Sequence, residues 1–330
     1  MITLPARVRR ALCASLLFVM PGVPPAHAEW LFGEQAIMGT RCAVELWSED
    51  RARGQAAIEA VFTEFRRIDA AMSTFRPTSE LARVNAAAAH TPVPVSRELY
   101  DLLATSIEYS RITRGAFDIT YASVGYLYDY RRHVHPDDAA IAAALPAIDY
   151  RHIELQPAGT AVRFTHPDVR IDLGGIGKGY AVDRGIAVLQ AAGIERAMVN
   201  AGGDTRIIGD RLGRPWVVGI RHPDDEHRVV LRMPVTDAAM STSGDYERFF
   251  EEGGVRYHHI LDPRTGKSAS KVRSVTIIGP TATRTDALTK SIFVLGPEEG
   301  LALIESLGDV DAVVVMPSGK VLYSRGLTPP

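Results

Sequence analysis

The residues best suited to chemistry lie in a glycine-rich stretch, Ile171 to Asp183, that reads IDLGGIGKGYAVD. Four glycines occur within positions 174–179, and glycine lets a backbone approach a ligand closely. A helix expected to begin near Tyr180 would direct free N–H groups at this loop, a common arrangement for anion binding. Lys178 adds a mobile positive charge that suits phosphate. The stretch therefore predicts a cradle for a phosphorylated ligand.

Two familiar nucleotide-binding motifs do not account for this loop. A P-loop requires Ser or Thr directly after Gly-Lys, whereas Gly179 follows Lys178 here. A Rossmann fingerprint requires the spacing G-x-G-x-x-G, which the glycines from Gly175 or Gly177 do not provide. On the local sequence alone, the simpler alternative is a glycine-rich turn with a solvated lysine.

Further short motifs accompany the loop along the chain. In order they are Met38-Gly39-Thr40, Met72-Ser73-Thr74-Phe75, 79–85 (SELARVN), 115–120 (GAFDIT), 200–204 (NAGGD), 243–248 (SGDYER), 258–266 (HHILDPRTG) and 285–290 (TDALTK). Each motif is weak alone, but in this order and spacing they closely resemble the ApbE family, the FAD:protein FMN transferases, over about residues 30–325.

The resemblance implies a reaction and the residues that carry it. FAD would be cleaved, and FMN would be attached through a phosphoester to a Thr or Ser hydroxyl of an acceptor protein, usually with Mg²⁺. The implied FAD contacts are Met38, Phe75, Ala116, Phe117, Asp118, Asp172, Lys178, His259 and Ile260. The Gly175 carbonyl and the Asp286 carboxylate would bind the metal. Met38, Phe75 and Phe117 can equally be core residues.

The catalytic candidates are Asp286, Lys178 and Asp245. Asp286 has a second interpretation as a helix-start residue that the helix dipole favours. Asp245 either accepts a proton near the flavin ligand or caps a helix. The serine before it lacks the preceding glycine of a nucleophile elbow, which argues against a hydrolase. The adjacent His258 and His259 lack the spacing of a zinc site.

The 285–290 motif departs from the family's commonest pattern, Asp-Ala-Leu-Ala-Thr. Here Thr289 and Lys290 follow Asp286 by three and four residues, and both positions face Asp286 on a helix. Thr289 is therefore a third candidate ligand for Mg²⁺, a cation that prefers oxygen ligands. Alternatively, Lys290 places an ammonium where the metal would bind, and its charge disfavours a nearby Mg²⁺.

Three functions fit these motifs. The first is a transferase that moves FMN from FAD to an exported or membrane redox protein. The second is a catalytically weak FAD-binding protein that stores or delivers flavin, with Lys290 in place of the metal. The third is a metal-dependent FAD pyrophosphatase that releases FMN and AMP. Phosphoryl transfer depends mainly on positioning and electrostatics, so the same site could serve each of them.

The N-terminus predicts a signal peptide over residues 1–28 and a periplasmic protein. Three arginines precede a short apolar run, and Ala26-His27-Ala28 fits a cleavage site before Glu29. Cleavage would remove three arginines and no acidic residue, changing the formal charge from −2 to −5. A mildly acidic chain argues against a nucleic-acid partner, and no second apolar run is long enough to anchor the mature chain in a membrane. Cys42 would be a buried thiol.

The remaining pattern predicts a single α+β domain over residues 29–330, with a mainly antiparallel sheet and flanking helices. The resemblance implies a T-fold-like core. Helices are expected at 55–72, 99–112, 139–145, 181–192, 286–295 and 298–306. Strands are expected at 41–47, 153–155, 161–164, 197–199, 205–208, 216–220, 229–235, 239–242, 258–261, 272–278 and 311–316.

Overall fold

Strands β1 (Glu29–Ile37) and β2 (Thr40–Ser48) form an antiparallel hairpin near the start of the chain. The structure is a computed structural model that describes residues 28–223 and 225–327. Met38 and Gly39 form the hairpin turn with φ values of 55° and 68°, as a tight turn between two twisted strands requires. No strand was expected before residue 41, so β1 is an additional strand that the sequence pattern missed.

The main sheet contains eight antiparallel strands within the described residues. In spatial order they are β1, β2, β6 (Ala197–Ala201), β7 (Asp204–Ile208), β10 (Ala239–Gly244), β15 (Ser274–Gly279), β16 (Asp311–Val315) and β17 (Val321–Tyr323). Sequence-neighbouring strands pair in several places, and long insertions separate the others. The predicted α+β class with a mainly antiparallel sheet is confirmed.

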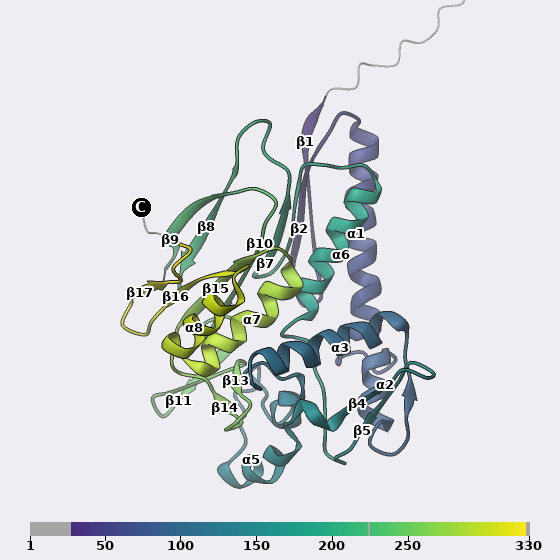
Figure 1. Cartoon of the computed structure of the whole chain (residues 1–330), viewed down its shortest axis with the longest axis vertical. Helices are drawn as coiled ribbons and strands as arrows, with labels where there is room; N and C mark the ends of the chain where they lie inside the picture. Colours follow the sequence, from purple (N-terminus) through teal and green to yellow (C-terminus); the bar gives the residue numbers. More distant parts are fainter. Residues whose placement is uncertain (1–27, 224, 328–330) are drawn as a thin grey trace, which may run out of the picture.

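A row of helices covers one face of this sheet (Figure 1). The row consists of α1 (Arg51–Met72), α6 (Gly177–Ala191), α7 (Ala282–Leu295) and α8 (Pro297–Leu307). The apolar face of α1 includes Phe62, Phe65 and Ile68, which are buried against the sheet and α6. Cys42 is completely buried in the same core, as predicted. This packing holds the starts of α6 and α7 beside the strand ends.

A second group of elements lies below the main sheet in Figure 1. It contains α2 (Glu80–Ala87), β3 (Val93–Pro94), α3 (Arg97–Ile112), η1 (Ile119–Tyr121), α4 (Ala122–Gly125), α5 (Asp138–Ala144), η2 (Leu145–Ala147), η3 (Tyr150–His152), β4 (Ile153–Gln156) and β5 (Ala161–Phe164). The glycine-rich stretch leads from β5 back to α6, so it connects this group to the main sheet.

Three strand pairs complete the described fold. They are β8 (Trp216–His222) with β9 (Asp225–Val235), β11 (Phe249–Glu252) with β12 (Val255–His258), and β13 (Leu261–Asp262) with β14 (Lys267–Ser268). The expected strand at 258–261 is interrupted, because β12 ends at His258 and β13 begins at Leu261. The other expected strands and helices are present, with the same ends at 161–164 and shifted ends elsewhere. None of the helices in the described part of the chain has the length and apolarity needed to span a bilayer.

Candidate functional site

The first turn of α6 touches α7 backbone to backbone at Gly179. A Cβ atom added there would lie 2.2 Å from the carbonyl oxygen of Ala282 and 2.8 Å from Asp286 Cβ. Only glycine permits this approach, and it brings the Gly179 N–H to within 3.1 Å of Asp286 Oδ2, to which it donates. The helix also begins at Gly177, earlier than expected. Lys178 is therefore a helical residue fixed beside α7.

Four charged side chains meet at this contact. Lys178 Nζ lies 2.6 Å from Asp204 Oδ2 at the start of β7, and 3.9 Å from Asp286 Oδ2. Lys290, one turn after Asp286 on α7, contacts Asp286 Oδ1 and donates to the Asp286 carbonyl at 3.0 Å. The side chains of Asp204 and Asp286 are 2% and 1% exposed. Two ammonium groups thus balance two carboxylates in the protein interior.

The charges in this cluster shift the pKa values of Asp286 and Lys178. Burial by itself would raise the pKa of Asp286, but Lys178 and Lys290 outweigh it and lower that pKa below its ordinary value. Burial by itself would lower the pKa of Lys178, but Asp204 and Asp286 raise it above its ordinary value. Burial raises the pKa of Asp204 above its ordinary value, so Asp286 and Lys178 are the two groups of the cluster whose charged forms the surroundings favour.

The start of the glycine-rich loop is held by Asp172. Its carboxylate accepts hydrogen bonds from the Thr74 hydroxyl at 2.7 Å, the Tyr121 hydroxyl at 3.1 Å and the Gly174 N–H at 2.6 Å. Asn85, on α2, accepts from the Ile171 N–H and donates to the Ile171 carbonyl. The loop is therefore tied to elements nearly a hundred residues away. The sequence did not assign site roles to Tyr121 and Asn85. Only the folded chain shows that these two residues hydrogen-bond to the loop.

Gly175 lies between the loop and the charged cluster. A Cβ atom added there would lie 3.3 Å from Phe117 Cε2 and 3.5 Å from Lys290 Cε. Phe117 and Ala116 are both 3% exposed, and Phe117 packs edge-on against Tyr109. The structure thus brings Gly175, Phe117 and Asp286 to one place, and the stem of Lys290 passes beside Gly175.

Asp118 and Asp245 are each engaged by the protein itself. Asp118 accepts hydrogen bonds from Thr120 and from the Tyr150 N–H, and burial raises its pKa. Asp245 pairs with Arg273 at 2.6 Å and lies 3.4 Å from a nitrogen of Arg256. Both carboxylates support the surrounding backbone and charges in this arrangement. Their predicted roles toward FAD and in catalysis stay predictions.

The remaining predicted contacts differ widely in exposure. Phe75 is 88% exposed, next to Thr74, which binds Asp172. Met38 packs partly buried against the core from its turn. Ile260 is buried. Thr289 is fully buried: its hydroxyl donates to the Asp286 carbonyl at 2.7 Å and lies 2.8 Å from the Ser243 hydroxyl.

His259 carries an unsatisfied polar atom. Its Nδ1 is buried and has no hydrogen-bond partner among the described residues. Burial lowers the pKa of His259 to about 3, and the positive charges of Arg248, Lys290 and Lys178 act in the same direction. The imidazole is therefore neutral at physiological pH, with a ring nitrogen available to a ligand.

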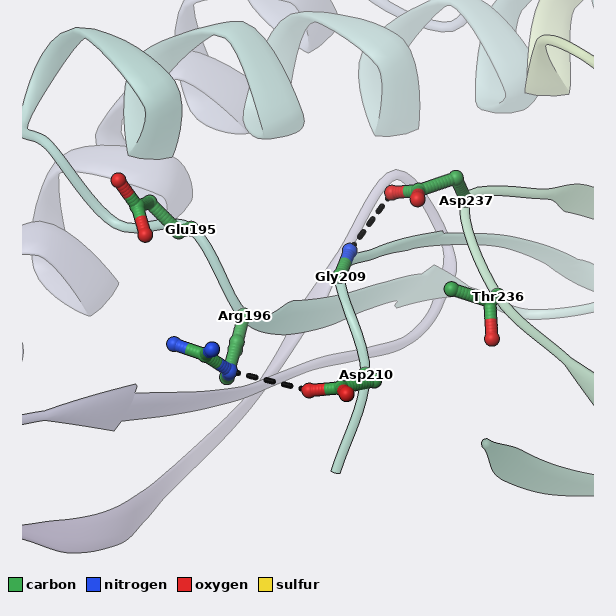
Figure 2. Close-up of a pocket in the computed structure, with 6 residues that line it drawn as sticks. All are labelled: Glu195, Arg196, Gly209, Asp210, Thr236 and Asp237. Carbon is green, nitrogen blue, oxygen red and sulfur yellow. Dashed lines mark hydrogen bonds and ion pairs between the residues drawn. The ribbon is translucent and has the colours of Figure 1, made fainter. Parts of the chain in front are cut away.

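Two hollows in the described structure lie away from these residues. One, of about 310 Å³, is lined by Glu195, Arg196, Gly209, Asp210, Thr236 and Asp237 (Figure 2). It lies where β6 begins and β7 ends, at the opposite end of these strands from Asp204. The other, of about 640 Å³, lies between α1, α3 and α6. The first contains no residue that the motifs single out, and the second contains Tyr180 of the glycine-rich stretch.

Comparisons with known proteins agree with the motif pattern. Residues 38–314 match the model of the ApbE family. An FAD:protein FMN transferase from Treponema pallidum (strain Nichols) is 36% identical, over 89% of this chain and 86% of the relative. One from Escherichia coli (strain K12) is 31% identical, over 91% and 90%.

Solved structures show the same fold. The crystal structure of the ApbE protein from Thermotoga maritima superposes with a TM-score of 0.84 at 32% identity, covering 90% of this chain and 98% of that one. The flavin transferase ApbE from Vibrio cholerae superposes with a TM-score of 0.80 at 30% identity, with the same coverage.

Proposed function

This chain belongs to the ApbE family of FAD:protein FMN transferases, and we propose that it transfers FMN from FAD to a Ser or Thr hydroxyl of an exported or membrane redox protein. The acceptor oxygen attacks the FMN-side phosphorus of the FAD pyrophosphate. The bond from that phosphorus to the bridging oxygen breaks, AMP leaves with that oxygen, and the hydroxyl proton is released. The products are a flavinylated protein, AMP and a proton.

The observation that carries this proposal is the pair of partly buried ammonium groups beside the glycine-rich loop. Lys178 and Lys290 lie at Asp286, and the Lys290 stem passes Gly175. Phosphoryl transfer requires positive charge where the pyrophosphate becomes more negative. The loop backbone at 172–176 and these two cations would bind the phosphates, with the flavin toward Phe75 and Phe117.

The neutral His259 gives this site a group that can accept a proton. In the tautomer with Nδ1 unprotonated, the unpaired nitrogen can take the proton of the attacking hydroxyl. Bound phosphates would raise the pKa of His259 from its low value, since negative charge favours the imidazolium. Asp245 is less suited to this step because Arg273 and Arg256 already engage it.

The residues predicted to bind Mg²⁺ do not fit a metal in their present arrangement. Lys290 engages Asp286 Oδ1, and the Gly179 N–H engages Asp286 Oδ2. The Thr289 hydroxyl donates to the backbone of its own helix. Magnesium dependence through Gly175, Asp286 and Thr289 is a prediction from the sequence that this arrangement does not support. No step of this reaction is assigned to the metal.

Export is part of the proposal. The predicted signal peptide of residues 1–28 lies almost entirely outside the described residues, and β1 begins at Glu29. Cleavage after Ala28 would therefore leave every described strand and helix intact. N-terminal sequencing of protein recovered from the periplasm should begin at or near Glu29, and an intact Met1 would contradict export with cleavage.

The proposed transfer is tested by incubating the mature protein with FAD and a purified, unflavinylated domain of an exported redox protein. We expect an FMN adduct on a Ser or Thr by mass spectrometry, with one AMP released for each adduct. FMN and AMP without an adduct would indicate a pyrophosphatase. FAD binding without cleavage would indicate a flavin carrier, the alternative that Lys290 at Asp286 favours.

The phosphate site is tested with Lys178→Ala. We expect FAD binding to weaken by about 1.5–3 kcal/mol, the range for a charge-assisted hydrogen bond. Flavin fluorescence titration measures the affinity, and Lys320→Ala, at an exposed turn, is the matched control for the loss of one lysine. Equal FAD affinity in both variants would remove Lys178 from the FAD site.

A further inference from the structure

The Lys290 ammonium occupies the position that a metal shared by Gly175 and Asp286 would need. Lys290 Nζ contacts Asp286 Oδ1, and its Cε lies 3.5 Å from where a Gly175 Cβ would be. The Lys290 side chain is only 17% exposed. The lysine is therefore packed between the two predicted ligands and does not extend into solvent.

The charge count of the cluster is already balanced without a metal. Asp204 and Asp286 contribute two negative charges, and Lys178 and Lys290 contribute two positive charges at contact distance. Before FAD binds, a divalent cation would leave this cluster with a net charge of +2, which a site largely removed from water disfavours. With Thr at position 290, as in the commonest family pattern, the cluster would be negative and would attract a cation.

Thr289 does not compensate for the change at position 290. Its hydroxyl is fully buried and is shared between the Asp286 carbonyl and Ser243. The hydroxyl is therefore already engaged on two sides. Within the described residues there is also no cluster of three or more His, Cys, Asp or Glu side chains that could hold a metal elsewhere.

We propose that Lys290 is the resident cation of this transferase, held by Asp286 in place of a divalent metal, and that FMN transfer proceeds without added metal. The inference rests on the proposed function. Lys290 supplies one positive charge, and because its ammonium already donates to the carbonyl and the carboxylate of Asp286, one N–H donor remains for the phosphate oxygens of FAD. It provides no open coordination position, so its contribution is electrostatic.

The direct test is metal binding by the mature, chelator-treated protein. Mn²⁺ serves as the probe and free Mn²⁺ is followed by EPR, with and without FAD, and with FAD alone as the blank. We expect the native protein to take up no more Mn²⁺ than the blank. Lys290→Thr, which restores the commonest family residue, should bind one Mn²⁺ per chain, whereas Lys290→Met should bind none.

Metal dependence of the transfer is the second readout. EDTA should change the native rate by less than about twofold, whereas Lys290→Thr should lose about 10²-fold in EDTA and recover with Mg²⁺. The rate of Lys290→Met should fall by a similar factor with EDTA and with Mg²⁺, because methionine has neither the positive charge of lysine nor the oxygen ligand of threonine. Lys320→Thr, at an exposed turn, controls for the loss of a lysine and should behave as the native protein.

Three results would overturn the assignment. They are native transfer that stops in EDTA and returns with Mg²⁺, uptake of Mn²⁺ by the native protein, and a Lys290→Thr rate with Mg²⁺ more than about tenfold above the native rate. The last would show that Lys290 blocks the metal without replacing it. If FAD binds but no variant forms an adduct, the proposed function fails, and the Mn²⁺ titration still decides the cation assignment.

Discussion

Strands β6, β7 and β10 end in two very different groups of charges. At one end, Lys178, Asp204, Asp286 and Lys290 are packed against two helices, and both carboxylates are almost completely buried. At the other end, Arg196 pairs with Asp210 at 3.1 Å beside the 310 Å³ hollow, with side chains 38% and 36% exposed (Figure 2).

The comparison shows that the hollow and the buried charges lie at opposite ends of the same strands. The hollow has an open, solvated ion pair, and such pairs contribute little to stability or reactivity. In the buried cluster, desolvation makes each charge costly unless it is paired. Buried charges with perturbed pKa values are typical of functional sites. The candidate site is therefore identified by its buried charges.

Among the substitutions that test this difference, Asp286→Asn should have the largest effect. The change leaves Lys178 and Lys290 facing one carboxylate, and removing one partner of a buried ion pair costs about 3–5 kcal/mol. We expect that loss in the free energy of unfolding by urea denaturation, together with loss of FMN transfer. A variant with native stability would show that water already solvates the cluster.

Gly179→Ala tests the helix contact that creates the cluster. The added Cβ would lie 2.2 Å from the Ala282 carbonyl oxygen, so α6 and α7 must separate. Overpacking of this kind costs about 1–3 kcal/mol. FAD affinity should fall together with stability. Gly177→Ala is the control, since a Cβ there would lie 3.6 Å from Leu173 Cβ, an ordinary contact; equal effects of the two changes would contradict this role of Gly179.

The low pKa of His259 predicts that the stability of the folded protein depends on pH. Burial lowers its folded-state pKa to about 3, whereas the unfolded value is near 6.5. Between these values the unfolded chain binds the extra proton, so stability is present above about pH 6.5 and is lost as the pH falls toward 3. The native protein should lose about 1 kcal/mol more per pH unit than His259→Gln over this window. Identical pH profiles in thermal denaturation would exclude a buried neutral His259.

Asp210→Asn should have the smallest effect. The carboxylate is solvent-exposed, so water replaces the ion pair with Arg196 when it is lost. We expect urea midpoints and FAD affinity to match those of the native protein within error. Asp210→Asn and Asp286→Asn make the same chemical change. The difference between their effects on stability and FAD affinity therefore measures the contribution of burial. A marked loss of FAD affinity would assign the hollow a role in the site.

Local pattern predicted much of the fold. The apolar spacing in 55–72 and 99–112 indicated the helices that became α1 and α3, because amphipathic faces are set by neighbours three and four residues apart. The first strand was missed. In β1, exposed and less exposed positions alternate from Leu31 to Ile37, but the residue types do not follow this alternation, because Phe32 is exposed and Gln35 is partly buried. An edge strand is fixed by its partner more than by its own pattern.

The glycine-rich loop shows where the local prediction stopped. Its sequence indicated a phosphate cradle with a mobile Lys178, but the fold pairs that lysine with Asp204, 26 residues away. The helix begins at Gly177 because Gly179 packs on Ala282, a contact across about a hundred residues. A pattern of neighbouring residues does not reveal contacts between residues so far apart in the sequence.

The sequence by itself determined the family, the α+β class and the residue types of the site, since these follow from motif order and from side-chain periodicity. It also reduced the question at position 290 to two outcomes, a metal held by Thr289 or an ammonium in its place. Only the tertiary structure favoured one arrangement: it buried Asp286 beside Gly175 and turned Thr289 toward its own backbone. It also placed Lys290 on the carboxylate. The physical reason is burial, because two carboxylates removed from water must find opposite charge nearby, and the fold supplies it from two lysines.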